Sequence, residues 1–262
     1  MSAASIHPRQ EADVQYLLRI GDTCLILSQR IAEWCGHAPI LEEDIALANM
    51  ALDLVGQARA VLTRAGERHA DAGGAAFDED QLAFLREERD YRNPSLVELP
   101  RGDFAFTVLR NAFVATLLKA LWQRLQASSD AEVAAIAGKA LKEARYHQQH
   151  AADWVVRLGG GTAESATRLQ RALDDLWRFV PELFEDDDID RAAAAQGLGP
   201  SWSELRTAWD DEVTALLVAA GLQAPKASAF RSTGKRGVHT EHMGFLLAEM
   251  QTLQRTYPGG VW

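Results

Sequence analysis

Three polar side chains lie on one face of a long, otherwise apolar segment. Asn49, Asp53 and Gln57 are four residues apart, so a helix over residues 35–59 places them in a single row. The residues around them are apolar nearly all round the helix, which predicts that this helix is buried. Carboxylates and amides in a helical core need hydrogen-bond partners, a bound group or a neighbouring subunit. The row is therefore either a catalytic face or an internal polar row that fixes helix register.

A second polar group lies in the helical segment over residues 129–158. Glu143 and His147 share one helix face, where a carboxylate and an imidazole could hold one metal ion, and Tyr146 lies beside them. The alternative is an internal hydrogen-bonded network without a metal. Cys24 also has two interpretations, as a small core residue or as a metal ligand.

The composition is that of a globular protein. Hydrophobic residues make up 47% of the 262, with only 19 Gly and 8 Pro. The formal net charge of −10 argues against nucleic-acid binding. Two cysteines, Cys24 and Cys35, are too few for a disulfide framework or a structural zinc site. We see neither a signal-peptide layout nor a run of about 18 apolar residues that could span a membrane, so we expect a soluble cytoplasmic protein.

The spacing of apolar residues predicts an all-α fold. Four long helices form two pairs, each joined by a short turn, at residues 36–39 and 128–130. Between the pairs lies a connection long enough to cross the bundle, and two antiparallel pairs with one long crossover form a ferritin-like bundle. We expect one domain over residues 1–262, with residues 1–12 flexible and residues 184–262 forming a C-terminal helical extension packed on the bundle.

Local signals predict where some helices begin. Ser129 with Glu132 forms one candidate capping box, and Ser201 with Glu204 forms another. A shorter helix is expected over residues 80–91, within the crossover.

A ferritin-like di-iron site takes one Glu from each of two helices and a Glu-x-x-His from each of the other two. Superposing the two pairs by their Leu and small-residue spacing places Leu54 and Gln57 where the first Glu and His belong. The second copy keeps Glu143 but has Tyr146 at the His position, with His147 one residue late. Half of the carboxylates are missing, so the charge of two iron ions would be uncompensated. We therefore expect no metal in this chain.

At these residues the chain closely resembles a known family, the C subunits of ring-1,2-phenylacetyl-CoA epoxidase, the multicomponent monooxygenase of phenylacetate catabolism. The resemblance covers nearly all of the chain after Val14. Its most specific segments are LRIGDTCLILSQRIAEWCGHAP, EEDIALANMALDLVGQAR, KALKEARYHQQH, LWRFVPELF and STGKRGVHTEHMGFLLAEMQTLQR.

The resemblance implies a ferritin-like subunit that pairs with a related catalytic A subunit. That A subunit holds the di-iron centre and phenylacetyl-CoA, and a reductase subunit with flavin and an iron–sulfur cluster delivers electrons from NADPH. This chain would be the partner whose metal site has decayed and which binds no cofactor. Cys24 then marks the former ligand position on the first helix. Residues 111–113 mark the position on the other ligand-bearing helix, without a fixed register.

A basic loop precedes the last predicted helix of this acidic chain. Its candidate contact residues are Lys226, Arg231, Lys235, Arg236, His239 and His242. One explanation is an ordinary solvated loop. The other is that the loop meets an acidic face of the A subunit or the phosphates of coenzyme A, because helix N-termini and basic side chains both attract anions. Two histidines are too few ligands for a metal site.

We expect a non-catalytic structural subunit whose partners are the A subunit and other subunits of the complex, with neither nucleic acid nor membrane as a partner. A homodimer is also compatible with the sequence. Two alternatives stay open at this point: a self-sufficient ferritin-like metalloenzyme with one metal at Glu143 and His147, and a stand-alone homo-oligomeric scaffold.

Overall fold

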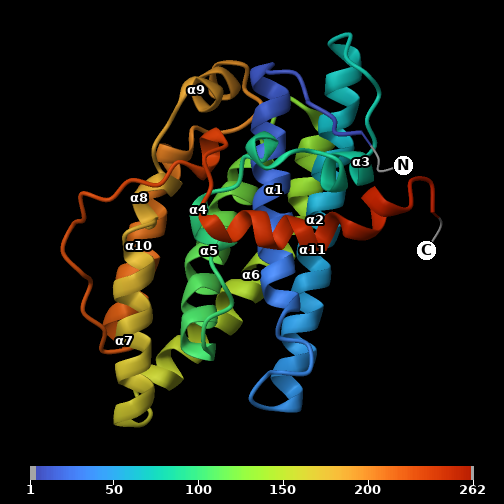
Figure 1. The fold of residues 1–262 in the computed structure, drawn as a ribbon. Helices are drawn as coiled ribbons and strands as arrows, with labels where there is room; N and C mark the ends of the chain where they lie inside the picture. The colour runs from blue at the N-terminus through green and yellow to red at the C-terminus, as the bar shows by residue number, and fades with distance from the viewer. Residues whose placement is uncertain (1–3, 261–262) are drawn as a thin grey trace.

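The computed structural model describes residues 4–260, and this part of the chain is helical, with two isolated bridges and no β-strand. The predicted all-α fold is confirmed (Figure 1). The α-helices are α1 (Ala12–Ala32), α2 (Leu41–Asp71), α3 (Glu79–Phe84), α4 (Ser95–Glu98), α5 (Phe104–Leu125), α6 (Ala131–Gly159), α7 (Ala163–Trp177), α8 (Val180–Leu183), α9 (Asp188–Ala195), α10 (Arg206–Ala219) and α11 (Glu241–Thr256). The 3-10 helices are η1 (Glu88–Asp90), η2 (Trp202–Leu205) and η3 (Gly234–Arg236).

Two helix pairs form the centre of the molecule. α1 packs along α2 and α5 packs along α6, each pair joined by a short turn. Residues 72–103, which include α3, η1 and α4, connect the first pair to the second (Figure 1). Two pairs with one long connection are consistent with a ferritin-like bundle.

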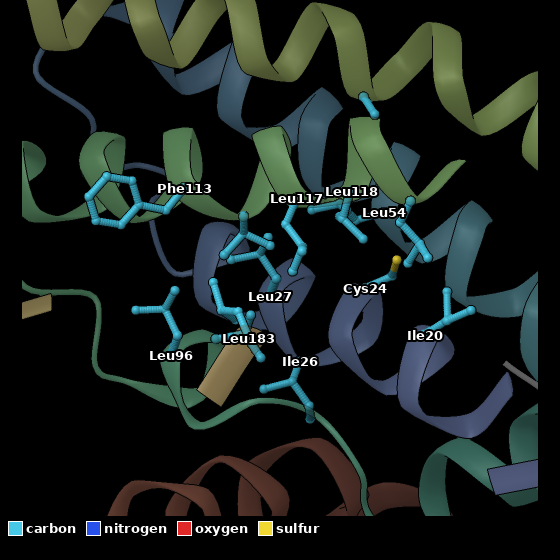
Figure 2. Close-up of a cluster of buried hydrophobic side chains, with 14 of the residues drawn as sticks. Ile20, Cys24, Ile26, Leu27, Leu54, Leu96, Phe113, Leu117, Leu118 and Leu183 are labelled. Carbon is cyan, nitrogen blue, oxygen red and sulfur yellow. The ribbon is translucent and has the colours of Figure 1, made fainter. Parts of the chain in front are cut away.

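Apolar side chains from both pairs meet in one core. Figure 2 shows part of it, in which α1, α2 and α5 converge with α4 and α8. Its labelled residues are Ile20, Cys24, Ile26, Leu27, Leu54, Leu96, Phe113, Leu117, Leu118 and Leu183. The core explains α5, which is apolar all round because it is surrounded by other elements.

The prediction that α2 is buried nearly all round is wrong. The side of α2 that faces away from α1 carries exposed large apolar residues, Leu41, Ile45, Leu52 and Val55. By length and hydropathy alone, α2 and α5 could each cross a membrane, contrary to the sequence-based expectation. The most apolar window of α5 is 78% buried inside the structure and that of α2 only 44%. The core therefore accounts for most of the apolar composition of α5 but for only part of that of α2.

Helix ends follow the sequence signals only in part. Ser201 and Glu204 do form a capping box, which opens η2 ahead of α10. Ser129 does not cap α6; its hydroxyl donates to the Gln196 carbonyl, and the carboxylate of Asp130 accepts the first-turn N–H groups instead. The helix predicted over residues 80–91 is divided in the structure: α3 ends at Phe84, and a separate 3-10 helix, η1, covers Glu88–Asp90.

Long-range bonds explain the early end of α3. The Arg86 side chain donates back to the Leu82 carbonyl and pairs with the fully buried Asp22 of α1. These contacts hold the chain in a turn where the helix would otherwise continue.

The remaining segments pack on the outside of the bundle. α11 lies across the first pair, close to α3, α4 and η1 (Figure 1). At the other end of the chain, the Ile6 N–H donates to the Leu85 carbonyl and the His7 ring contacts Asp90. Residues 1–3 of the segment expected to be flexible lie outside the described part. The division into bundle and C-terminal extension stays a prediction.

Candidate functional site

One polar group lies at the centre of the bundle and takes one residue from each of the four long helices. The side-chain oxygen of Gln57 on α2 accepts from the indole N–H of Trp122 on α5 at 3.2 Å and from the thiol of Cys24 on α1 at 3.7 Å. Its amide nitrogen donates to Glu143 on α6 at 3.0 Å. Cys24, Gln57 and Trp122 are buried, and Glu143 is partly buried. Every polar atom of the Gln57 side chain thus has a partner within the group.

These four side chains do not fit a di-iron centre. Glu143 is the only carboxylate among them, and an indole N–H is a donor that cannot bind a metal. Burial, and next the charge of Glu143, raises the pKa of Cys24, so the sulfur stays a neutral thiol. A ferritin-like di-iron site instead needs a Glu from each of the four helices to balance the metal charge. The residues present complete one another's hydrogen bonds and leave no anionic ligand set.

Leu54 and Tyr146 lie outside this group. Leu54 is buried in the apolar cluster, beside Cys24 in Figure 2. Tyr146 is on the surface, with 53% of the residue exposed and its ring 6.1 Å from the rings of His147 and His150. The Tyr146 side chain therefore does not point into the bundle, contrary to what the superposition of the two helix pairs predicts.

The burial pattern corrects that superposition by one residue. Residues 41–57 of α2 and residues 131–147 of α6 repeat the same sequence of buried, half-buried and exposed positions. In this register Gln57 is equivalent to His147 and Asp53 to Glu143. Leu54 is then equivalent to Ala144, a small core residue, and not to Glu143.

Polar contacts continue along the line where α2 meets α6, which we call the α2–α6 seam. His147 Nε2 lies 3.0 Å from Asp53 Oδ2, beside the Gln57–Glu143 bond. Burial lowers the pKa of His147, and the contact with Asp53 only partly offsets this, so the ring is neutral at pH 7 and donates to Asp53. Further along, the carboxylate of Asp130 takes bonds from Arg64 and Arg68 of α2.

The seam therefore joins α2 to α6 through the polar row predicted from the sequence. Two members of that row, Asp53 and Gln57, make cross-helix bonds, whereas Asn49 is exposed. Within residues 4–260, no three His, Cys, Asp or Glu side chains are grouped so that they could hold a metal ion. Metal binding by Glu143 and His147 has no support in the geometry, because each bonds to a different residue of α2.

Some of the predicted contact residues of the basic loop are buried, and others are exposed. Lys235 is only 3% exposed, and its ammonium donates to the Glu185 carbonyl and lies 3.5 Å from Asp190 and 4.7 Å from the centre of the Trp202 ring. Arg19 of α1 pairs with the same Asp190 at 2.7 Å. Burial, and next the charge of Arg19, lowers the pKa of Lys235 to about 8. Lys235 thus holds the loop to the bundle and is not available to an external phosphate.

His239 is also directed inward. Its Nδ1 lies 2.7 Å from the Glu98 carboxylate and its Nε2 3.2 Å from the Tyr91 carbonyl, and the side chains of His239 and Glu98 are fully buried. Burial opposes the charged ring, but the bond to Glu98 outweighs it and raises the pKa of His239. Both ring nitrogens face acceptors, so the ring is an imidazolium that donates twice.

The other four predicted contact residues are at the surface. Lys226, Arg231 and Arg236 are exposed, and His242 is half-buried. Arg231 forms an ion pair with Glu185 at 3.3 Å.

Sequence reasoning missed Trp122, the member of the central group on α5, and placed the position on that helix at residues 111–113. Phe113 instead packs on Trp177 and Trp209, and Asn111 Oδ1 is buried without a hydrogen-bond partner. No local signal marks Trp122, because its role comes from Gln57, 65 residues earlier in the chain.

Comparisons with known proteins bear on this arrangement. The family described as phenylacetic acid catabolic protein matches residues 1–262. The chain is also similar to a protein of Escherichia coli (strain K12), the C subunit of 1,2-phenylacetyl-CoA epoxidase. The two are 50% identical over 247 residues, which cover 94% of this chain and 98% of that protein.

Proposed function

This chain belongs to the phenylacetic acid catabolic protein family, and we propose that it is the non-catalytic structural subunit of a phenylacetyl-CoA epoxidase. In that complex a related A subunit would bind the di-iron centre and phenylacetyl-CoA, and a reductase would supply electrons from NADPH. The reaction would insert one oxygen atom of O2 across the aromatic ring. This chain would brace the A subunit in the cytoplasm and bind no cofactor itself.

The central group at Gln57 is the observation that carries this proposal. It lies where the four long helices meet, the place from which a ferritin-like bundle binds its metals. Here the Gln57 amide is hydrogen-bonded to a thiol, an indole and one carboxylate. The group can fix the register of the four helices, but it offers neither the negative charge nor the open ligand positions of an oxygen-activating centre.

The exposed members of the basic loop remain candidates for contact with the partner. Lys226, Arg236 and His242 have no assigned internal role, unlike Lys235 and His239. A carboxylate-bearing face of the A subunit is the kind of surface they would meet.

The test is to assay the chain alone and mixed with its A subunit and reductase. We expect epoxide formation only in the mixture. Activity should survive Glu143→Gln in this chain and be lost when a carboxylate ligand of the A subunit is replaced. Metal analysis of this chain purified alone should find less than about 0.1 iron per chain, as for a protein without a ligand set. Turnover by the chain alone, or near-stoichiometric iron removed by Glu143→Gln, would refute the proposal.

A further inference from the structure

The exposed apolar residues of α2 form a continuous stripe. Leu41, Ile45, Leu52 and Val55 are 71%, 54%, 67% and 39% exposed. Their spacing places them on one helix face over a length of about 21 Å. We call these four residues the α2 stripe. By comparison, Val218 is the one exposed large apolar residue on α10, and α11 carries two that are eight residues apart, Phe245 and Leu253. Scattered exposed apolar residues are ordinary on a protein surface.

Nothing in the bundle itself requires the α2 stripe to be apolar. α6 has the same burial pattern as α2, so each stripe residue has an equivalent position there. The equivalents of Leu41, Ile45, Leu52 and Val55 are Ala131, Ala135, Lys142 and Arg145. At these equally exposed positions α2 thus carries large apolar side chains where α6 carries small or basic ones, which indicates that the outer face of α2 is covered by another surface.

The charges at the two ends of the stripe identify the occupant. Glu42 is exposed at the first end and Arg59 at the other. If two α2 helices pack antiparallel with Ala48 opposite Leu52, then Ile45 lies opposite Val55 and each Glu42 lies beside the Arg59 of the other helix. The Nε of Arg59 donates to Glu79 at 2.9 Å, but its side chain is 73% exposed, so its terminal nitrogens can reach a second carboxylate. In this arrangement the apolar residues of the stripe face one another, and its two ends are complementary in charge.

We propose that the α2 stripe is an isologous interface at which a second copy of this chain docks about a two-fold axis near Ala48 and Leu52. An interface of this symmetry uses the same patch twice, as the pairing of Ile45 with Val55 requires. Tyr146 is exposed and adjoins His147, which contacts Asp53 of α2, so this aromatic side chain lies on the α6 side of the stripe and can extend the contact. This inference goes beyond the proposed function, because it concerns the chain in the absence of other subunits.

The experiment measures self-association of the full chain alone by analytical ultracentrifugation between about 1 and 100 µM. The wild type should form dimers, and Leu52→Glu should raise the dissociation constant about 100-fold or more, because the carboxylate lies next to the axis and enters the interface twice. Val218→Glu is the matched control, since Val218 is equally exposed but on α10, and it should leave the dimer unchanged. Circular dichroism should show that both variants are folded.

A charge swap tests the antiparallel arrangement. Glu42→Arg and Arg59→Glu should each weaken the dimer about tenfold, and the double variant should restore it, because every ion pair is then re-formed with reversed signs. A monomeric wild type, a dimer that tolerates Leu52→Glu, or a double variant without rescue would each overturn the proposal. So would a Leu52→Glu variant that loses the A subunit but still dimerises, since the stripe would then belong to the A subunit.

Discussion

Replacing Gln57 by Leu should destabilise this protein without removing a catalytic group. Leu has a similar volume, so the bundle can close around it. The substitution leaves the Trp122 N–H without its acceptor, takes the acceptor from the Cys24 thiol and removes a donor from Glu143. This substitution therefore tests whether the central group fixes the register of the helices or takes part in catalysis.

The size of the effect follows from the burial of each partner. Trp122 is fully buried, and an unpaired buried N–H costs about 1–3 kcal/mol. The Glu143 side chain is 21% exposed, so water can replace the lost donor at little cost. The greater hydrophobicity of Leu returns up to about 1 kcal/mol. We expect the free energy of unfolding to fall by about 1–2 kcal/mol, which lowers the melting temperature by about 2–8 °C in a chain of this size.

The measurement is urea unfolding of Gln57→Leu, Trp122→Phe and the double variant. Once Trp122 has lost its N–H, the Gln57→Leu change should cost about 1 kcal/mol less, so the double variant should be more stable than the sum of the single effects predicts. Asn49→Leu is the matched control in the same row; Asn49 is exposed, so its effect should stay within about 0.5 kcal/mol. Strictly additive effects, or a stabilised Gln57→Leu, would refute a hydrogen-bonded central group.

Three further predictions concern other parts of the fold. His239 has a raised pKa in the folded protein, so its stabilising contribution should be complete below the unfolded pKa of about 6.5 and disappear as the pH rises through the folded pKa. In urea titrations the stability difference between wild type and His239→Gln should therefore shrink over that pH range. A constant difference would contradict the charged pair with Glu98. Lys235→Met should cost about 1–3 kcal/mol in the same assay by removing the donor to the Glu185 carbonyl and the contact with Asp190, whereas an unchanged midpoint would mean that the loop is held elsewhere. Gly66→Ala should be strongly destabilising, because its Cβ would lie 2.0 Å from the Phe77 carbonyl oxygen, while Gly138→Ala, with no atom within 4 Å, should stabilise by up to about 1 kcal/mol; equal melting temperatures for these two variants would be inconsistent with the packing.

The helical architecture could be predicted because its signals are local. Apolar spacing and short turns indicate the two long pairs, and the capping box at Ser201 and Glu204 forms as expected. Ser129 fails as a cap because Asp130 next to it can also cap, and a distant carbonyl at Gln196 takes up the serine hydroxyl. A contact of that kind leaves no mark in the neighbouring sequence.

The candidate site was harder to predict, for two physical reasons. A superposition by residue type cannot fix helix register to one residue, and one residue turns a side chain by about 100°, enough to put Tyr146 outside. Long-range pairing also decides burial: Lys235 belongs to an apparent surface cluster in the sequence, yet Asp190 and the Glu185 carbonyl hold its ammonium inside. Of the positions predicted for the former metal site, the structure brings Cys24, Gln57 and Glu143 together.

The α2–α6 seam also bears on the order in which the protein folds. Each helix pair is joined by a short turn and can form early as a local hairpin, whereas the seam contacts join residues 62 to 94 positions apart. Contacts of this kind form after the transition state when the hairpins nucleate folding. Substitutions such as Asp53→Ala or Glu143→Ala should then accelerate unfolding and leave the folding rate nearly unchanged. The seam would thus govern how long the folded bundle lasts rather than how fast it forms.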